Sequence, residues 1–421
     1  MYYQRHKVNG LDVVLVDMPA SHATTIEIFV KAGSIYETSK TNGLSHFLEH
    51  MFFKWWIKYP TPALVAQAVD SFGGECNAYT GDEYSGYYIT CAPRYMGQAL
   101  DILADMLIHA QFPQPEMERE KWVVIQEIKM YEDNPQYLVR QKAQQWYLGK
   151  TPFGQTIAGP VSNVLWFRQE DLFAHRDNLY CKDNLVIVVA GKIGWMGKDD
   201  KARTESSAST SALLERIGEL FGDLPERKKI VRPTFVGRLP VKHEWSFKKK
   251  TQQHHVVMMA RWYDMFDETK YVADMLAHLL GWSMSSRLFQ NVREKKWLCY
   301  YIGAGHVDNV DNGSFKIIAG MDRKKWEEWL QAIYDEVADL AWGNIGQKEL
   351  DLVKGNVLWS TEMGIETSNQ MAHFVWWQAL FKDEIMNLDQ MLHYYEKVTL
   401  SDLIAVATKV KQENLYAYWI G

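Results

Sequence analysis

The amino-acid sequence predicts an α+β protein with two similar domains, each a mainly antiparallel sheet covered by helices. Three observations lead to this fold class. Short stretches rich in β-branched residues, several of them closed by Gly, alternate with longer helical patterns. The second half of the chain repeats the order of elements in the first half. The chain has 421 residues, which is too many for one ordinary hydrophobic core.

In the first half, strands are indicated by β-branched runs or by alternation of apolar and polar residues. They are predicted at residues 11–18, 24–33, 75–93 (a hairpin) and 185–193. Helices are indicated by apolar residues that recur every three to four positions. They are predicted at residues 43–56, 61–72, 95–110 and 116–133. The helix that begins near Thr61 ends at Gly73 and Gly74, which are typical helix-stop residues.

The middle of the chain has no clear period. Residues 197–211 are polar and predict a mobile loop, and residues 224–245 are rich in Pro and charge and predict a linker. We therefore expect an N-terminal domain at 1–225, a linker at 226–245 and a C-terminal domain at 246–421.

The second half restarts the same plan. Residues 254–262 and 313–321 are predicted strands, and the helix predicted at 268–282 matches in order the helix at 43–56. That second helix offers only His278 where the first carries two histidines and a glutamate, so one half is expected to hold the chemistry.

The composition excludes several classes of protein. Hydrophobic residues make up 47% and charged residues 23%, which is typical of a globular chain. The formal charge of −6 gives no basic footprint for nucleic acid. The cysteines form no CxxC pair, and no apolar run is long enough to cross a bilayer. No signal peptide is apparent, so we expect a cytoplasmic protein without a membrane span.

The stretch GLSHFLEHMFF, residues 43–53, carries the chemical signal. His46 and His50 are four residues apart, so on a helix they project in the same direction, close enough to share one Zn²⁺. Glu49 lies beside them and can take a proton from a metal-bound water. The alternative is a solvated helix face, but the apolar neighbours indicate partial burial, and buried His and Glu need partners.

A catalytic zinc site usually has three protein ligands and an open position. Glu120 and Glu127 are seven residues apart, and so lie on one face of the helix predicted at 116–133. One of them can bind the metal, and the other can orient a ligand histidine. The residues alone do not decide which glutamate takes which role.

The HFLEH motif followed by the distant Glu127 resembles the inverted zinc motif of the inverzincin family of pitrilysin, insulin-degrading enzyme and mitochondrial processing peptidase. Further stretches resemble the same family over nearly the whole chain. These are GGECNAYTGDEYSGYY, TPFGQTIAG and SSRLFQNVREKKWLCYY. The half-size length resembles the processing-peptidase branch.

The resemblance implies a role for each matching residue. It implies one zinc ion per chain held by His46, His50 and Glu127, with Glu49 as the general base and Glu120 as an outer-shell catalytic acid. It implies further that Asn77 and Ala78 hold substrate along a strand edge, and that Arg293 and Tyr300 grip substrate from the second domain. Without the resemblance, a turn residue is the better interpretation of Asn77. For Arg293 and Tyr300, an ordinary surface ion pair and a packed aromatic side chain are as good an interpretation as a substrate-binding pair.

We therefore expect a zinc metalloendopeptidase that hydrolyses peptides or unfolded segments with a metal-bound water activated by Glu49. The alternatives are a non-catalytic structural or assembly subunit and a peptide-binding module of the same fold. Because one chain carries both the zinc motif and the Arg/Tyr pair, we expect a clam-shell homodimer, with a heterodimer as the alternative. Two departures from the family pattern place Trp55 and Trp297 where Gly is usual.

Overall fold

The computed structural model describes residues 3–193, 206–226 and 230–421, and the chain falls into two compact units. The first unit comprises residues 1–128, 155–233 and 363–387, and the second comprises residues 129–154, 234–362 and 388–421. Both units are therefore discontinuous in sequence. The linear domain boundaries expected at residues 225 and 245 stay a prediction.

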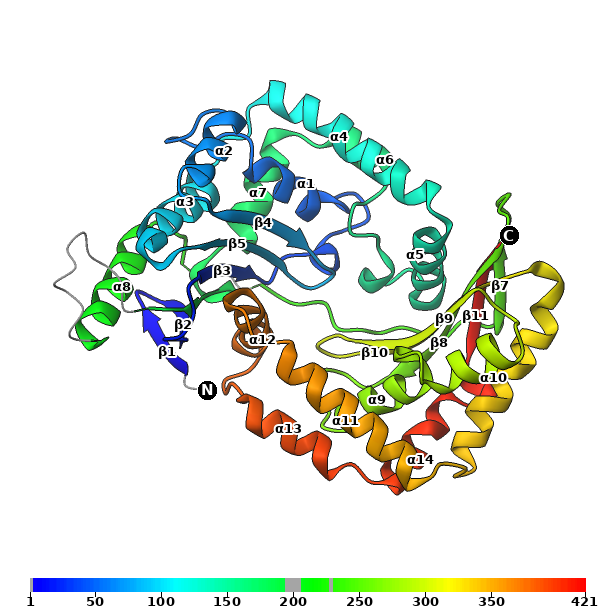
Figure 1. Cartoon of the computed structure of the whole chain (residues 1–421). Helices are drawn as coiled ribbons and strands as arrows, with labels where there is room; N and C mark the ends of the chain where they lie inside the picture. The colour runs from blue at the N-terminus through cyan, green and yellow to red at the C-terminus, as the bar shows by residue number, and fades with distance from the viewer. Residues whose placement is uncertain (1–2, 194–205, 227–229) are drawn as a thin grey trace. The chain divides into compact units, whose positions relative to one another are not determined.

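The predicted fold class is confirmed, because each unit contains one mixed, mostly antiparallel sheet covered by helices (Figure 1). The sheet of the first unit has the strand order β1-β2-β6-β3-β5-β4, in which only β2 and β6 run parallel. Its strands are β1 (Tyr3–Val8), β2 (Leu11–Asp17), β3 (Thr24–Val30), β4 (Glu75–Thr80), β5 (Ser85–Cys91) and β6 (Leu185–Gly191). The clam-shell dimer stays a prediction.

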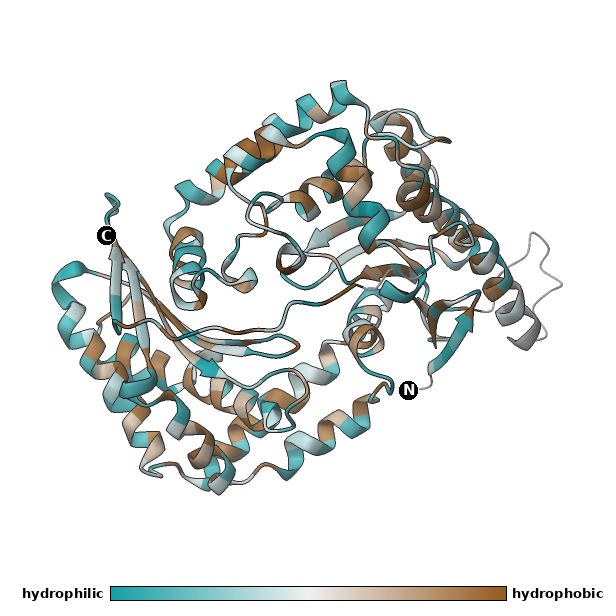
Figure 2. Ribbon diagram, turned by 180° about the vertical axis from the view of Figure 1, so that it is seen from behind, coloured by the Kyte–Doolittle hydropathy of each residue, from teal (hydrophilic) through white to brown (hydrophobic). Residues whose placement is uncertain are grey.

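Helices cover both faces of this first sheet. One face packs mainly against α1 and α3, and the other face packs against α12. The α-helices of the first unit are α1 (Leu44–Phe52), α2 (Pro62–Asp70), α3 (Met96–His109), α6 (Val161–Trp166), α7 (Gln169–Leu179), α8 (Ser206–Leu220) and α12 (Ser368–Phe381), with most of α4 (Gln114–Asp133). The covering helices carry both hydrophobic and hydrophilic residues, as amphipathic helices do (Figure 2).

The central strands are apolar on both sides because both faces of the sheet are covered. In β2, Val13 belongs to the core beside α1 and α3, whereas Val14 belongs to the core beside α12. On the α12 side, Phe29 stacks on Trp376 with ring centroids 4.4 Å apart. The stacked pair ties α12, a segment from late in the sequence, to a strand from its beginning.

The sheet of the second unit has the strand order β7-β11-β8-β10-β9, with only β7 and β11 parallel. Its strands are β7 (Glu244–Phe247), β8 (His254–Trp262), β9 (Tyr301–Asp308), β10 (Gly313–Met321) and β11 (Tyr416–Ile420). Helix α5 packs against β8 and β11. The α-helices of this unit are α5 (Pro135–Leu148), α9 (Lys270–Ala277), α10 (Trp326–Ala341), α13 (Leu388–Lys397) and α14 (Leu400–Ala407), with nearly all of α11 (Gln347–Met363).

Short helical turns complete the two units. The first unit contains 3-10 turns at η1 (Ser34–Tyr36), η2 (Pro93–Tyr95) and η4 (Lys182–Asn184). The second unit contains the 3-10 turns η3 (Pro152–Gly154), η8 (Arg323–Lys325), η9 (Thr408–Val410) and η10 (Gln412–Asn414), and the π-helical turns η6 (His278–Trp282) and η7 (Leu288–Lys295). Among the described residues, no helix is both long and apolar enough to cross a bilayer.

One local prediction needs correction. The polar stretch 197–211 was expected to be a loop, but helix α8 begins at Ser206. The part of that stretch before residue 206 lies outside the described residues. The small and polar residues at the start of α8 carry little apolar periodicity, which appears only farther along, where Leu213, Ile217 and Phe221 are buried.

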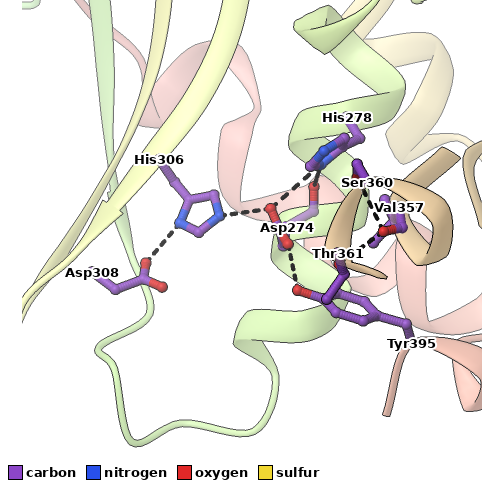
Figure 3. A network of polar contacts seen from close by, with 8 residues as sticks. All are labelled: Asp274, His278, His306, Asp308, Val357, Ser360, Thr361 and Tyr395. Carbon is purple, nitrogen blue, oxygen red and sulfur yellow. Dashed lines mark hydrogen bonds and ion pairs between the residues drawn. The ribbon is translucent and has the colours of Figure 1, made fainter. Parts of the chain in front are cut away.

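In the second unit, the helix that matches the HFLEH helix carries a network of polar side chains (Figure 3). The carboxylate of Asp274 lies 3.1 Å from His306 Nε2 and 3.4 Å from His278 Nδ1, and it accepts a hydrogen bond of 2.6 Å from the Tyr395 hydroxyl. His306 Nδ1 donates to Asp308 over 2.7 Å. Acidic and basic groups therefore compensate one another within the network.

This network makes the stability of the second unit depend on pH. Burial raises the pKa of Asp274, but its contacts with His278 and His306 outweigh burial and hold the pKa below its usual 3.8. Burial lowers the pKa of His306, but Asp274 and Asp308 outweigh it and raise the pKa from 6.5 to about 10. The Asp274 contribution is lost as pH falls below about 4, and the His306 contribution is lost as pH rises from about 6.5 through 10.

We predict that Asp274→Asn lowers the free energy of unfolding by about 1.5–3 kcal/mol at pH 6, since charge-assisted hydrogen bonds are lost. The difference between the variant and the wild type should shrink at pH 9.5, where His306 is losing its proton. Denaturant unfolding followed by tryptophan fluorescence at both pH values measures this. An equal difference at both pH values would contradict the account.

Candidate metal centre

The first turn of helix α1 is held by a buried carboxylate. Glu37 is 5% exposed and accepts hydrogen bonds from the backbone N–H groups of Gly43, over 2.8 Å, and Ser45, over 2.6 Å. These N–H groups have no partner within the helix, and an anion at this end also suits the helix dipole. Burial raises the pKa of Glu37 to about 7, although the hydrogen bonds from Ser45, Asn42 and Gly43 oppose the rise.

Gly43 lets the chain enter α1 at this point. Its φ of 100° is in the left-handed region, which favours glycine. A Cβ at this position would also lie 2.5 Å from the backbone oxygen of Ala158, in the stretch TPFGQTIAG. That stretch therefore packs directly on the start of the helix that carries the two histidines.

The structure brings His46, His50 and Glu127 together. The two rings lie one helical turn apart on α1, with centroids separated by 4.7 Å. Oε2 of Glu127, on α4, is 3.7 Å from His46 Nε2 and 3.3 Å from His50 Nε2. In the described part of the chain, these three residues are the one group of three or more His, Cys, Asp or Glu side chains whose ligand atoms all lie within 4.8 Å of one another.

The donor set fits a divalent metal ion. Two imidazole nitrogens and one carboxylate oxygen are ligands that Zn²⁺ accepts, and a three-residue set leaves a coordination position open. The side chains of His46 and Glu127 are 11% and 23% exposed, so the group is screened from bulk water. His46 Nδ1 is buried and makes no hydrogen bond to any described residue, whereas the other ring nitrogen, Nε2, faces Glu127 at 3.7 Å.

Glu120 orients His50 from behind. Its Oε1 accepts a hydrogen bond of 2.8 Å from His50 Nδ1, and its Oε2 forms an ion pair of 2.7 Å with Lys54. A proton on Nδ1 leaves the Nε2 lone pair facing Glu127 when the ring is neutral. Glu120 is 4% exposed; burial raises its pKa, but the contacts with His50 and Lys54 outweigh burial and lower it.

The pKa values of the two histidines are shifted in opposite directions. Burial and the neighbouring His50 lower the pKa of His46 to about 4. Burial also lowers the pKa of His50, but hydrogen bonds to Glu120 and Glu127 outweigh this and raise it to about 9. At neutral pH, cation binding by His50 therefore releases a proton, as metal binding to a protonated ligand must.

Glu49 lies beside the three residues without belonging to the group. Its Oε2 accepts a hydrogen bond of 2.5 Å from the hydroxyl of Thr80, at the end of strand β4. Burial raises the pKa of Glu49, and the Thr80 hydrogen bond opposes that rise. A carboxylate with a raised pKa next to a metal-ligand set has the properties expected of a general base.

Asn77 and Ala78 lie on β4, which is the last strand in the order of the first sheet. In the described part of the chain, β4 pairs with β5 alone, and Asn77 is exposed. Asn77 Oδ1 accepts a hydrogen bond of 2.9 Å from the N–H of Ala78. The structure therefore places both residues on a strand edge, where the alternative of a turn residue for Asn77 does not apply.

Arg293 and Tyr300 lie together in the second unit. Arg293 lies in the turn η7, and its Nε donates a hydrogen bond to the backbone oxygen of Tyr300 over 2.8 Å. Its guanidinium lies 4.4 Å from the centroid of the Phe289 ring. Tyr300 is 74% exposed. Between them, Trp297 has a φ of 54°, in the left-handed region, which explains why a glycine is easily accommodated at this position.

Three residues of the site were missed in the sequence. Lys54 is the only Lys or Arg in the largely apolar run from Phe47 to Ile57, and this was the signal that could have identified it. No sequence pattern pointed to Glu37 or Thr80. Glu37 acts across a turn by accepting hydrogen bonds from the start of α1, and Thr80 acts on Glu49, which is distant in sequence.

The chain matches two family models. Residues 12–161 match the model of insulinase, peptidase family M16, and residues 207–357 match the model of the peptidase M16 inactive domain. The candidate metal ligands His46, His50 and Glu127 lie within the first match.

Relatives match almost the whole chain. The uncharacterised zinc protease YmxG of Bacillus subtilis is 30% identical over 409 residues, which is 96% of this chain and 95% of the relative. An uncharacterised zinc protease of Streptomyces coelicolor is 28% identical over 402 residues, which is 95% of this chain and 85% of the relative.

Solved structures share the fold along the full length. A protease from Helicobacter pylori superposes with a TM-score of 0.86 at 20% identity, covering 100% of this chain and 99% of the other. A structure from Pseudomonas fluorescens described as a peptidase M16 inactive domain has a TM-score of 0.88 at 17% identity, covering 100% and 98%.

We predict that Glu120→Gln weakens zinc binding about ten- to hundredfold, because His50 loses the anion that fixes its tautomer and orientation. Zinc affinity is measured by competition with a chromophoric chelator. Glu118→Gln is the matched control, since Glu118 lies on the same helix with a side chain that is 54% exposed, and it should bind zinc as the wild type does. Equal affinity of Glu120→Gln and the wild type would contradict the role of Glu120.

Proposed function

Because the chain belongs to peptidase family M16, we propose that it is a zinc-dependent endopeptidase that hydrolyses peptides or unfolded segments. The observation that carries the proposal is the convergence of His46, His50 and Glu127 on one point, with the carboxylate of Glu49 beside them. This combination supplies both a metal-ligand set and a base.

Zinc would be held by the two Nε2 atoms and by Oε2 of Glu127. When bound, zinc acts as a Lewis acid that polarises a carbonyl and acidifies a water molecule. Its choice over other divalent ions is supported by the ligand types and by the relatives, which are zinc proteases. Glu120 and Lys54 support the site from behind by fixing the ring of His50.

Glu49 moves the proton. Its carboxylate takes one proton from the attacking water as the water oxygen bonds to the carbonyl carbon of the substrate. When the carbon–nitrogen bond breaks, Glu49 delivers that proton to the leaving amine. The hydrogen bond from Thr80 engages one carboxylate oxygen, so the other oxygen serves this transfer.

Substrate would lie along β4 as an added strand. A strand edge binds an extended peptide through backbone hydrogen bonds, largely regardless of the peptide's sequence. The position of Asn77 and Ala78 on the last strand of the sheet supports this mode. An extended substrate must be a peptide or an unfolded segment, because a folded domain presents few free strands.

Arg293 and Tyr300 would contact the same substrate from the second unit. An exposed tyrosine hydroxyl can donate to a peptide carbonyl, and a guanidinium can contact carbonyl or carboxylate groups. The hydrogen bond from Arg293 Nε to the backbone oxygen of Tyr300 keeps the two residues together, and Tyr300 is exposed; both observations support a shared role. Because a single chain carries the metal-ligand set and this pair, we propose a homodimer rather than an obligatory heterodimer.

We predict that Glu49→Gln lowers the rate of peptide cleavage by about 10²–10⁴, because glutamine cannot take up the proton. The bound zinc should remain, since Glu49 is not a ligand. Cleavage of a fluorogenic, unstructured peptide and the zinc content of the protein are measured on the same sample. Glu170→Gln, at an exposed position of α7, is the matched control and should cleave normally.

Chelation completes this test. Removal of zinc from the wild type should abolish cleavage, and added zinc should restore it. Full cleavage by Glu49→Gln, or cleavage that survives chelation, would refute the proposed mechanism. Zinc binding without any cleavage by the wild type would instead favour a non-catalytic subunit or a peptide-binding module.

A further inference from the structure

Thr80, the last residue of strand β4, forms a hydrogen bond with Glu49, the proposed general base. The Thr80 hydroxyl lies 2.5 Å from Glu49 Oε2, which is at the short end for an O–H···O hydrogen bond and typical of a charged acceptor. Glu49 is on α1 and Thr80 is on the strand proposed to hold substrate, so the hydrogen bond joins the two parts of the site.

The direction of this hydrogen bond follows from its neighbours. An ionised carboxylate can only accept, so the proton belongs to Thr80. Ser85, opposite Thr80 in the hairpin, has its hydroxyl 3.0 Å from the backbone oxygen of Ala32 and 3.4 Å from Thr80 Oγ1. Its single proton is taken by the nearer carbonyl, and the Thr80 proton is left for Glu49.

The register of β4 is fixed on the opposite face as well. Tyr79, the preceding residue, donates its hydroxyl over 2.7 Å to Glu27, which is 0% exposed. Successive strand residues face opposite sides of a sheet, so Tyr79 and Thr80 hold β4 from both sides. A slip of one residue would break both hydrogen bonds, which makes this register strongly specified.

We propose that Thr80 is a positioning residue for Glu49: its hydroxyl holds Oε2 and thereby presents Oε1 to the attacking water. This inference rests on the proposed peptidase function and adds a residue to it. It also gives the base and the substrate-binding edge a common support, because Asn77, Ala78 and Thr80 belong to one six-residue strand. A misplaced base is costly, since a shift of about 1 Å in a reacting group can reduce a rate about 10²-fold.

The test compares Thr80→Val, which keeps the shape of the side chain and removes the hydroxyl, with Thr80→Ser, which keeps the hydroxyl. For cleavage of a fluorogenic peptide, Thr80→Val should lower kcat about ten- to hundredfold. Its KM should stay within about twofold and its zinc content should be unchanged. Thr80→Ser should restore kcat to within about threefold of the wild type. Thr80→Ala takes the place of the valine variant if that variant does not fold.

Thr90→Val is the matched control. Thr90 lies on β5 and shares a hydroxyl contact of 2.9 Å with Thr25, away from Glu49, so its loss tests the general effect of removing a sheet hydroxyl. Its kcat should match that of the wild type. A value of kcat for Thr80→Val within twofold of the wild type, or equal losses in Thr80→Val and Thr90→Val, would overturn the proposal.

A crystal structure of Thr80→Val gives a readout that does not depend on activity. The Glu49 carboxylate should leave its wild-type position or occupy two conformers, while His46, His50 and Glu127 stay in place. An unchanged Glu49 would overturn the positioning role even in a chain that cleaves no peptide. If the wild type cleaves and Glu49→Gln does not, the proposed function stands whatever the outcome for Thr80.

Discussion

Two imidazoles and a carboxylate that are largely removed from water cost free energy unless each has a polar partner. His46, His50 and Glu127 bring two ring nitrogens and a carboxylate oxygen together, with Glu127 Oε2 3.7 Å from His46 Nε2 and 3.3 Å from His50 Nε2. Polar groups removed from water need partners, and a divalent cation would satisfy all three at once. The surrounding structure serves this constraint: Glu37 and Gly43 start the helix, and Glu120 with Lys54 fixes one ring.

The first sheet places strand β4 beside Glu49, which follows the candidate ligand His46 on α1. Strand β4 is the last strand in the order of the sheet, and in the described part of the chain only β5 pairs with it. The side chain of Thr80, at the end of β4, donates a hydrogen bond to Glu49. The second unit repeats the order of strands and helices without the ligands. At the matching helix, Asp274, His278 and His306 compensate one another's charge. In the second unit these polar groups are paired with one another, whereas His46, His50 and Glu127 of the first unit form a candidate metal site.

The sequence predicted those features that depend on local spacing. The four-residue interval from His46 to His50 and the seven-residue interval from Glu120 to Glu127 give one helix face each, and the structure keeps both. Contacts between segments that are distant in sequence could not be predicted in this way. The Thr80 hydroxyl, the Glu37 carboxylate and the Lys54 ion pair depend on tertiary packing. Amphipathic periodicity also does not say which sheet a helix covers, so the places of α5 and α12 in the two units could not be foreseen.

We propose above that one metal ion lies between the two histidine rings, and the chemistry of the site depends on it. Anomalous diffraction collected on both sides of the zinc absorption edge, from crystals of the zinc-loaded protein, tests it most directly. We expect one strong peak per chain, bonded to His46, His50 and Glu127 at about 2.0–2.2 Å. A map without a peak at that point, from protein loaded with excess zinc, would contradict the account.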